Sequence, residues 1–272
     1  MANNRYNINE NIEEFQEEIK VGLSQGLDLI GTAYGDGKWV ASYQDTPNNT
    51  GFATASSASE LGQIVQQQWQ VGGYRLTDVE YGDGVWFGTF EENYGANTYS
   101  NSTSLTELQE DISQAWSLGY ELVNVEYGDG IWFGTFSDVP GGNGYETATS
   151  DGEFIEDIQN MWNQGLDLVD VEYGDGIWFG TFQEDSSITC GYVSGSTFDE
   201  LLGNFQQQFG SQGYELVDVE YGNGAWLGVT EKEVPQNAFE NPALYPLAVA
   251  LEEQKTAIMV DVLSFNDFDI PW

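Results

Sequence analysis

Four glutamates stand at one position of a repeated pattern, each directly before a Tyr-Gly pair, and a carboxylate or amide stands two residues earlier. The glutamates are Glu80, Glu126, Glu172 and Glu220, and the earlier residues are Asp78, Asn124, Asp170 and Asp218. Residues two apart on a strand point to the same face, so each unit presents two oxygen-bearing side chains together. If the strands line a common axis, oxygen ligands in such numbers suit Ca²⁺ or Mg²⁺. We therefore predict a divalent-metal site at Glu80, Glu126, Glu172, Glu220, Asp78, Asp170 and Asp218.

A second interpretation of these acids needs no ligand. Alternating acids keep a sheet face hydrated and discourage pairing between sheet edges, and duplication copies such residues whatever they do. The first unit has Gly31 and Ala33 at the two positions. Carboxylates held close together without a cation would repel and raise one another's pKa. Repetition alone does not separate a metal site from a hydrated face.

Five tryptophans hold one position in the strand after the turn, and their role depends on the register of the hairpin. They are Trp39, Trp86, Trp132, Trp178 and Trp226. A two-residue loop pairs Tyr127 with Trp132, sets Glu126 beside Phe133 and buries the Trp row under the helices, which is the favoured arrangement. A three-residue loop pairs Glu126 with Trp132 and forms a surface for a sugar or a cation. In that second register, the candidate ligand-binding residues are Trp86, Trp132, Trp178 and Trp226.

Residue types exclude several catalytic chemistries. The chain has no His, which removes a Ser-His-Asp triad and any His-ligated transition metal. It has no Gly-rich phosphate loop leading into a lysine, and its one cysteine, Cys190, has no evident base. Five units of helix and sheet also suggest the ring of the guanidino-modifying enzymes, but that chemistry needs Cys, His and acidic residues at its centre. We expect no catalytic residues.

The charge of the chain is strongly negative. It has 6 Lys and Arg against 45 Asp and Glu, for a formal net charge of −39, and no cationic residue lies between Leu76 and Glu231. Such a protein repels nucleic acid and anionic membranes and attracts cations and basic proteins. Without a signal segment or an apolar stretch long enough to span a bilayer, we expect a soluble cytoplasmic protein. Export without a cleavable signal is the alternative.

The acidic and aromatic positions recur because the chain is a tandem repeat. The string Tyr-Gly-Asp/Asn-Gly begins at Tyr34, Tyr81, Tyr127, Tyr173 and Tyr221, at spacings of 47, 46, 46 and 48 residues. Periods of this length indicate an array whose units pack on their neighbours. We predict one α+β domain, residues 1–235, of five helix-plus-hairpin units that close into a propeller-like ring. The predicted units are 8–57, 58–103, 104–150, 151–196 and 197–235.

Each unit is predicted to open with a helix and to continue with a hairpin and a looser third strand. Ser104 and Glu107 have the spacing of a capping box, which recurs in three other units. The helices are expected to end at Gly26, Gly73, Gly119, Gly165 and Gly213. Asp-Gly or Asn-Gly between β-prone runs predicts the hairpin turn. Third strands are expected at 51–57, 97–103, 144–150 and 190–196, so the fifth unit lacks one.

Residues 236–272 depart from the repeat. A helix near 244–254 and a strand near 256–265 are expected to cap the array, since terminal units of repeat proteins need capping. The alternative is that this tail docks a partner, because its last residues, 265–272, form an acidic-aromatic peptide.

The repeat resembles the tandem repeats in the C-terminal half of plant casein-kinase-like proteins, which also occur in some bacterial caspase-like proteins. The residues that carry the resemblance in the third unit are Trp116, Gly119-Tyr120, Tyr127 to Gly130 and Trp132. It covers roughly residues 8–231. The family motif carries no catalytic residues, so the resemblance implies a non-catalytic interaction module. This chain departs from the family in having mostly acidic residues before Tyr-Gly.

These observations favour a non-catalytic binding or assembly protein that engages a basic protein partner or divalent cations through its acidic repeats. No cofactor is required in this interpretation, although Ca²⁺ or Mg²⁺ could bind. A carbohydrate-binding module or glycoside-acting enzyme is the first alternative, and it would use Trp with paired carboxylates. A structural protein of a surface layer or filament, or another homo-oligomer, is the second.

Overall fold

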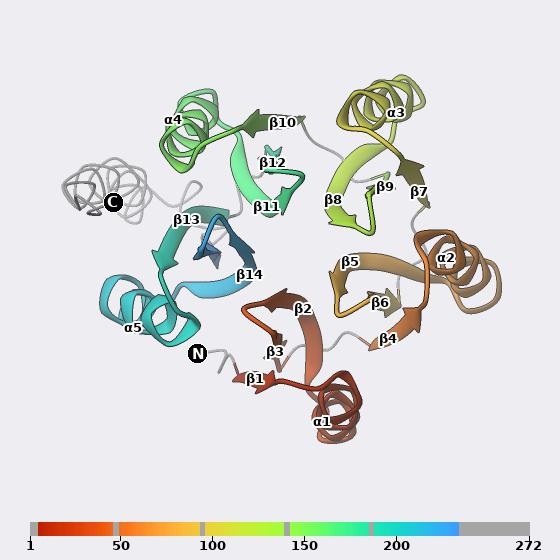
Figure 1. The fold of residues 1–272 in the computed structure, drawn as a ribbon, viewed down its shortest axis with the longest axis horizontal. Helices are drawn as coiled ribbons and strands as arrows, with labels where there is room; N and C mark the ends of the chain where they lie inside the picture. Colours follow the sequence, from red (N-terminus) through yellow and green to blue (C-terminus); the bar gives the residue numbers. More distant parts are fainter. Residues whose placement is uncertain (1–4, 46–48, 93–95, 139–141, 185–187, 234–272) are drawn as a thin grey trace, which may run out of the picture.

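The computed structural model describes residues 5–45, 49–92, 96–138, 142–184 and 188–233. Within these ranges the chain forms five repeating units, each with one helix and one three-stranded antiparallel sheet (Figure 1). Each unit runs in the order outer strand, helix, inner strand and middle strand, and the middle strand pairs with both others. The prediction of a repeated α+β unit is confirmed.

Equivalent elements recur in all five units. The outer strands are β1 (Arg5–Asn9), β4 (Thr50–Ala55), β7 (Asn97–Ser102), β10 (Asn143–Ala148) and β13 (Ile188–Gly195). The helices are α1 (Ile12–Ser24), α2 (Ala58–Gly72), α3 (Leu105–Ser117), α4 (Asp151–Trp162) and α5 (Phe198–Gln208). The inner strands are β2 (Asp28–Gly35), β5 (Tyr74–Gly82), β8 (Glu121–Gly128), β11 (Asp167–Gly174) and β14 (Glu215–Gly222). The middle strands are β3 (Lys38–Gln44), β6 (Val85–Glu92), β9 (Ile131–Ser137), β12 (Ile177–Gln183) and β15 (Ala225–Glu233).

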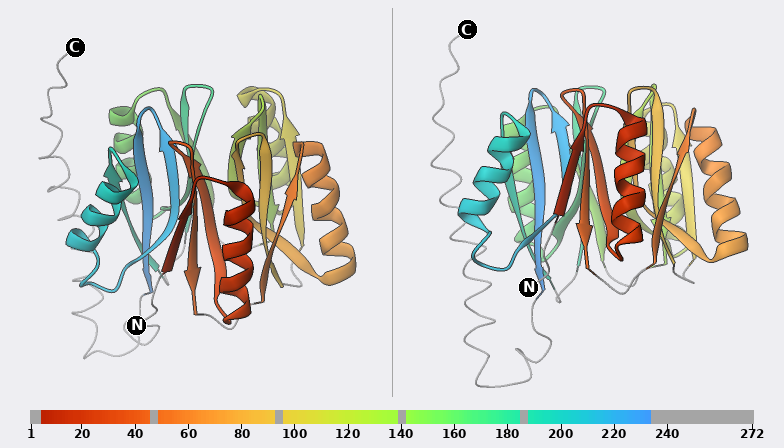
Figure 2. Two further views of the ribbon diagram at one scale, coloured as in Figure 1. Left: turned by 60° about the horizontal axis from the view of Figure 1, so that its bottom comes forward. Right: turned by 90° about the horizontal axis from the view of Figure 1, so that it is seen from below.

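The views in Figures 1 and 2 show how these elements are arranged. The five sheets lie around a common centre, with the inner strands nearest to it and the helices on the outside. The inner strands therefore bring equivalent residues of every unit toward one axis. None of the helices in the described ranges has the length and apolar character needed to cross a bilayer.

The third strands exist, but their place in the repeat differs from the prediction. β4 follows the first hairpin in the sequence, yet it pairs with β6 of the second. The reason is that β3 already has a strand on each edge, β1 and β2, so β4 must join the next sheet. Each unit thus begins one strand earlier than predicted, with β1 opening the first unit. The fifth sheet is complete, with β13 as its outer strand.

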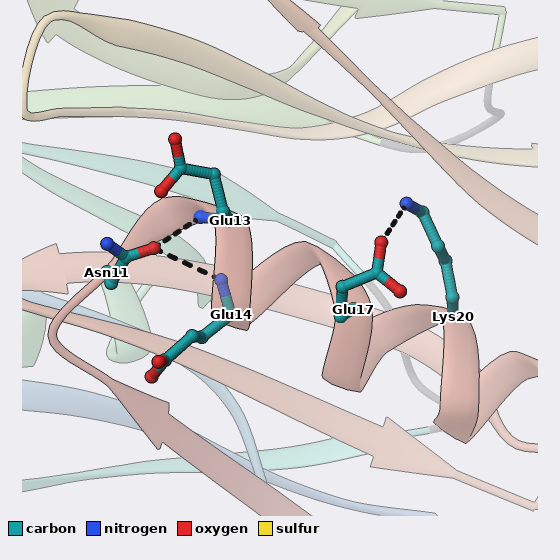
Figure 3. Close-up of polar contacts among 5 residues, drawn as sticks. All are labelled: Asn11, Glu13, Glu14, Glu17 and Lys20. Carbon is teal, nitrogen blue, oxygen red and sulfur yellow. Dashed lines mark hydrogen bonds and ion pairs between the residues drawn. The ribbon is translucent and has the colours of Figure 1, made fainter.

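The helix boundaries follow the capping signals. In α2 to α5 the N-cap hydroxyl of Ser57, Ser104, Ser150 or Thr197 accepts a hydrogen bond from the backbone N–H of the Glu three residues later. In α1, Asn11 Oδ1 accepts from the N–H groups of Glu13 and Glu14 at 2.8 and 3.2 Å (Figure 3). Figure 3 also shows the exposed Lys20–Glu17 ion pair on this helix. The five predicted terminal glycines all have positive φ, between 68° and 83°.

The hairpins have two-residue loops. Asp129 and Gly130 have φ values of 50° and 75°, and Tyr127 pairs with Trp132 while Glu126 pairs with Phe133. The five repeat tryptophans are at most 3 % exposed and belong to the apolar cores. The register with Trp and Glu on one surface is therefore not the one adopted. Trp86, Trp132, Trp178 and Trp226 do not form a ligand-binding surface, because they pack beneath the helices.

Neighbouring units interlock through their cores. Phe133 of β9 is fully buried in the core of the second unit, and Phe179 of β12 in that of the third. The equivalent residues Phe87, Leu227 and Val40 enter the cores of the first, fourth and fifth units. At the end of each inner strand, a glycine lies under the Tyr of the preceding unit, and Gly35 of the first lies under Tyr221 of the fifth.

The Tyr–Gly contact leads to a test of interlocking. A Cβ atom at Gly128 would lie 2.1 Å from Cγ of Tyr81 in the preceding unit. We expect Gly128→Ala to lower the free energy of unfolding by about 1–3 kcal/mol, because the Tyr81 ring must move. Chemical denaturation measures the change. The matched control is Gly203→Ala on α5, where a Cβ meets nothing within 4 Å and Ala should add about 1 kcal/mol. Equal effects of the two substitutions would contradict this account.

Candidate cation site on the axis

The acidic residues of the inner strands bind the backbone of the neighbouring unit. Each inner strand pairs with one strand of its own sheet, so the amides of its other edge need a different acceptor. Aspartates of the following unit supply it. The contacts are Thr32 N to Asp78 Oδ2 at 2.8 Å, Val125 N to Asp170 Oδ2 at 3.0 Å, and Val171 N to Asp218 Oδ2 at 2.9 Å.

The glutamates form a second set of such contacts two residues further along the strands. The amide of Tyr81 donates to Glu126 Oε1 at 3.0 Å, and the amide of Tyr127 donates to Glu172 Oε1 at 3.2 Å. Glu126 and Glu172 also interact with each other, and the pKa of both is raised above its usual value, first by burial.

Burial and mutual repulsion favour the protonated form throughout this cluster. The four glutamates are 3–6 % exposed. Burial raises the pKa of Asp78 to about 6, of Asp218 to about 7 and of Glu172 to about 8. The pKa values of Asp170, Glu80, Glu126 and Glu220 are also raised, first by loss of hydration and then by the neighbouring carboxylates. A cation brought to the axis would therefore relieve a repulsion that the fold itself creates.

The junction between the fifth unit and the first is built differently. Gly31 and Ala33 have no carboxylate to offer, and the amide of Val219 donates to Oδ1 of its own neighbour Asp218 at 2.8 Å. A Cβ at Gly31 would lie 2.8 Å from the carbonyl oxygen of Val217, so glycine allows the two inner strands to approach closely. The side chains of Gln44 and Glu215 add a hydrogen bond across this junction.

A cavity of about 250 Å³ lies among the beginnings of the five inner strands. Every inner strand contributes to it, and its acidic groups are Asp78, Asp170, Asp218 and Glu231. Asn124, the third-unit equivalent of these aspartates, also lines it. The cavity thus unites residues from units that are far apart in the sequence.

A β-bulge in each inner strand adds an apolar collar to the cavity. The pairing register shifts between a buried leucine and the Asp, Asn or Gly two residues later, in all five sheets. Bulges of this kind redirect a side chain. The residue at each bulge lines the cavity, and these residues are Ile30, Thr77, Val123, Val169 and Val217.

The structure therefore divides the predicted site residues into two groups. Asp78, Asp170 and Asp218 line the cavity, whereas Glu80, Glu126, Glu172 and Glu220 are not among the residues that line it. The collar and Asn124 were not predicted as site residues. The sequence did contain a signal for the collar, because four of its five residues are apolar in the middle of strands that otherwise alternate. The alternating pattern does not show, however, toward which face of the sheet a bulge directs its side chain.

The donor set fits a metal ion poorly. Among the described residues, no group of three or more Asp, Glu, Cys or His side chains has the arrangement of a metal site. Asp78 and Asp170 each use both carboxylate oxygens for hydrogen bonds, with Asn124 Nδ2 donating to Oδ1 of both at 3.3 and 2.7 Å. Ca²⁺ requires six to eight oxygen ligands, and these oxygens are already engaged.

Comparison with protein-family models gives no match for this chain, and comparison with curated proteins gives none either. The assignment of a function therefore depends on the geometry of the axis.

The raised pKa values predict a particular dependence of stability on pH. The folded protein holds protons on the axial carboxyls that the unfolded chain has already released, so this stabilisation is full below about pH 4 and is lost as pH rises through 6 to 8. For Asp78 alone the loss is on the order of 3 kcal/mol. Thermal unfolding between pH 4 and pH 9 measures the loss of stability.

Matched variants separate the effect of the axial carboxyl groups on the pH dependence of stability from the effect of the overall negative charge. Glu172→Gln should flatten the loss of stability with pH, because it removes one titrating axial group. Asp129→Asn removes the same charge from an exposed turn and should leave the slope unchanged; the fifth unit already has Asn223 at this position. Identical slopes for the wild type and Glu172→Gln would contradict the assignment.

Proposed function

We propose that this protein is a non-catalytic, propeller-like ring that binds a cationic partner, a basic protein or a divalent cation, through its axial cavity. The observation that carries the proposal is the cavity itself, which all five inner strands line and which contains three repeat aspartates. Ligand sites are commonly concave and have a few polar groups in an apolar lining. This cavity is concave but more polar than most, because seven of its thirteen lining residues have polar or charged side chains.

The long-range electrostatics favour such a partner. The net charge is −39, and the sequence from Leu76 to Glu231 supplies no Lys or Arg that could neutralise the axial carboxylates. The field of such a surface raises the local concentration of cations and speeds the encounter with a basic protein. Short-range geometry at the cavity would then select among the cations that arrive.

The arrangement of the acids favours binding over catalysis. Asp78, Asp170 and Asp218 occupy equivalent positions and accept equivalent backbone hydrogen bonds. A glycoside-acting site needs one carboxyl group to act as acid and another with a different role. The repeat tryptophans, which would supply a sugar platform, are buried in the cores.

A thermal-shift experiment tests the proposal. At pH 8 and constant ionic strength, we expect a short Lys- and Arg-rich peptide to raise the midpoint of unfolding, and by more than millimolar CaCl₂ or MgCl₂ does, because the donor set fits a metal ion poorly. The rise should be about 2–4 °C for each kcal/mol of binding free energy. Asp218→Asn should reduce the rise, and Asp129→Asn on the exposed turn should keep it.

Two results would count against the proposal. One is the absence of a shift with any of the three probes. The other is an equal loss in Asp218→Asn and Asp129→Asn, because that would assign the effect to general surface charge rather than to the axis.

A further inference from the structure

We propose that the group recognised by the axial cavity is a primary alkylammonium, the chemistry of a lysine side chain or of a free alkylamine. This inference rests on the proposed function and specifies the ligand of the same site. It is carried by the combination of acidic residues, an unsatisfied amide oxygen and an apolar collar around one cavity.

The unsatisfied oxygen is the observation that points to a ligand. Asn124 lines the cavity and is 5 % exposed. Its Nδ2 donates to Asp78 and Asp170, so the assignment of nitrogen and oxygen is set by two carboxylate acceptors. Its Oδ1 is buried and has no hydrogen-bond partner among the described residues. A buried acceptor without a donor is costly, and an ammonium N–H that reached this oxygen from the cavity would remove that cost.

The number and placement of acceptors match an ammonium group. An ammonium has three N–H donors and no acceptor. Asp78, Asp170 and Asp218 line the cavity from three different units. Oδ2 of Asp78 and of Asp170 each accept two hydrogen bonds, but their Oδ1 atoms accept one each, as do both oxygens of Asp218, so these four oxygens can accept another donor. A compact charge with three donors can use such convergent, partly occupied acceptors without displacing the backbone contacts.

A guanidinium group fits the same acceptors less well. Bidentate pairing requires both oxygens of one carboxylate to face a planar fork. In Asp78 and Asp170 the two oxygens already accept from different donors, and in Asp218 they accept from the amides of Val171 and Val219. None of the three offers both oxygens together.

The collar favours a charge that carries a hydrocarbon stem over a hydrated metal ion. Four of the five collar residues are apolar, and they would contact the methylene groups of an alkyl chain as its ammonium reaches the aspartates. Ca²⁺ or Mg²⁺ would either place its coordinated waters in contact with these apolar side chains or exchange the waters for carboxylate oxygens that already accept hydrogen bonds. The volume of about 250 Å³ equals that of about eight water molecules at ~30 Å³ each, which is enough for a short alkyl stem.

The test is titration of the intact protein at pH 8 with n-pentylammonium chloride, followed by calorimetry and by NMR of the Ile30, Val123, Val169 and Val217 methyl groups. We expect saturable binding with methyl shifts at the collar. Affinity should fall about fourfold for each methylene removed from the stem. N,N,N-trimethylpentylammonium keeps the charge and the stem but lacks N–H donors, and its affinity should be lower by at least about tenfold. The affinity of the Asp218→Asn variant for pentylammonium should fall by at least about tenfold as well.

The controls distinguish the source of the ammonium group. Asp129→Asn should bind pentylammonium within twofold of wild type. A Gly-Lys-Gly peptide with blocked ends tests whether a lysine side chain can reach the aspartates of the cavity. Its Nε-acetylated form, which lacks the charge, is the control. Binding of the peptide assigns the site to a basic protein, and binding of the free amine alone assigns it to a small alkylamine; both results support the inference.

Other outcomes would overturn it. The alkylammonium assignment is wrong, while the proposed cation-binding function stands, if CaCl₂ shifts the collar methyl groups and pentylammonium does not. The same holds if N,N,N-trimethylpentylammonium, or n-pentylguanidinium titrated in the same way, binds as well as pentylammonium. If no cation shifts the collar methyl groups, both proposals fail. Because the ligand series uses wild-type protein, this result does not depend on the folding of any variant.

Discussion

The structure depends on how the backbone N–H groups on the unpaired edge of each inner strand find hydrogen-bond acceptors. In each three-stranded sheet the inner strand pairs with the middle strand only. The amides on its open edge must therefore find acceptors outside the sheet. Carboxylates of the next unit accept from Thr32, Tyr81, Val125, Tyr127 and Val171, and thereby tie one unit to another. The acids of the repeat are therefore structural acceptors first. Their second property, a concentrated negative charge, follows from bringing so many of them to one axis.

That concentration sets a constraint on the folded state. Buried carboxyl groups that repel one another must hold protons or share a cation, because the axial segments from Leu76 to Glu231 contain no Lys or Arg. The raised pKa values of Glu126 and Glu172 correspond to the first solution, in which protons are retained on the axial side chains. The aspartates are placed for the second, because they line a cavity that a cation can enter. Stability and ligand binding are thus coupled through the same side chains.

The departures from the repeat are as informative as the repeat. Gly31 replaces a carboxylate where the fifth unit meets the first, and the strands there approach more closely than any side chain would permit. Asn124 replaces the third-unit aspartate, and its amide group bridges the carboxylates on either side. Together they leave three aspartates and Asn124 around the cavity, and within the described ranges Oδ1 of Asn124 has no hydrogen-bond partner. A cavity with a defined donor and acceptor set requires such asymmetry, because five identical acids would only repel.

The sequence by itself determined the repeat, the helix caps and the positions of the hairpin turns, because each depends on residues close together in the chain. It left two registers open for the hairpins, and the structure adopts the two-residue loop. Ser104 with Glu107, and Asp129 with Gly130, behave as their spacing predicts. Local patterns could not show that β4 belongs to the sheet of β6, since that pairing is decided by which strand edges are already occupied. The bulges, the bridging role of Asn124 and the cavity were likewise decided by the tertiary structure. They arise where five inner strands meet, and the distances between residues 46 or more positions apart are fixed only when the units pack.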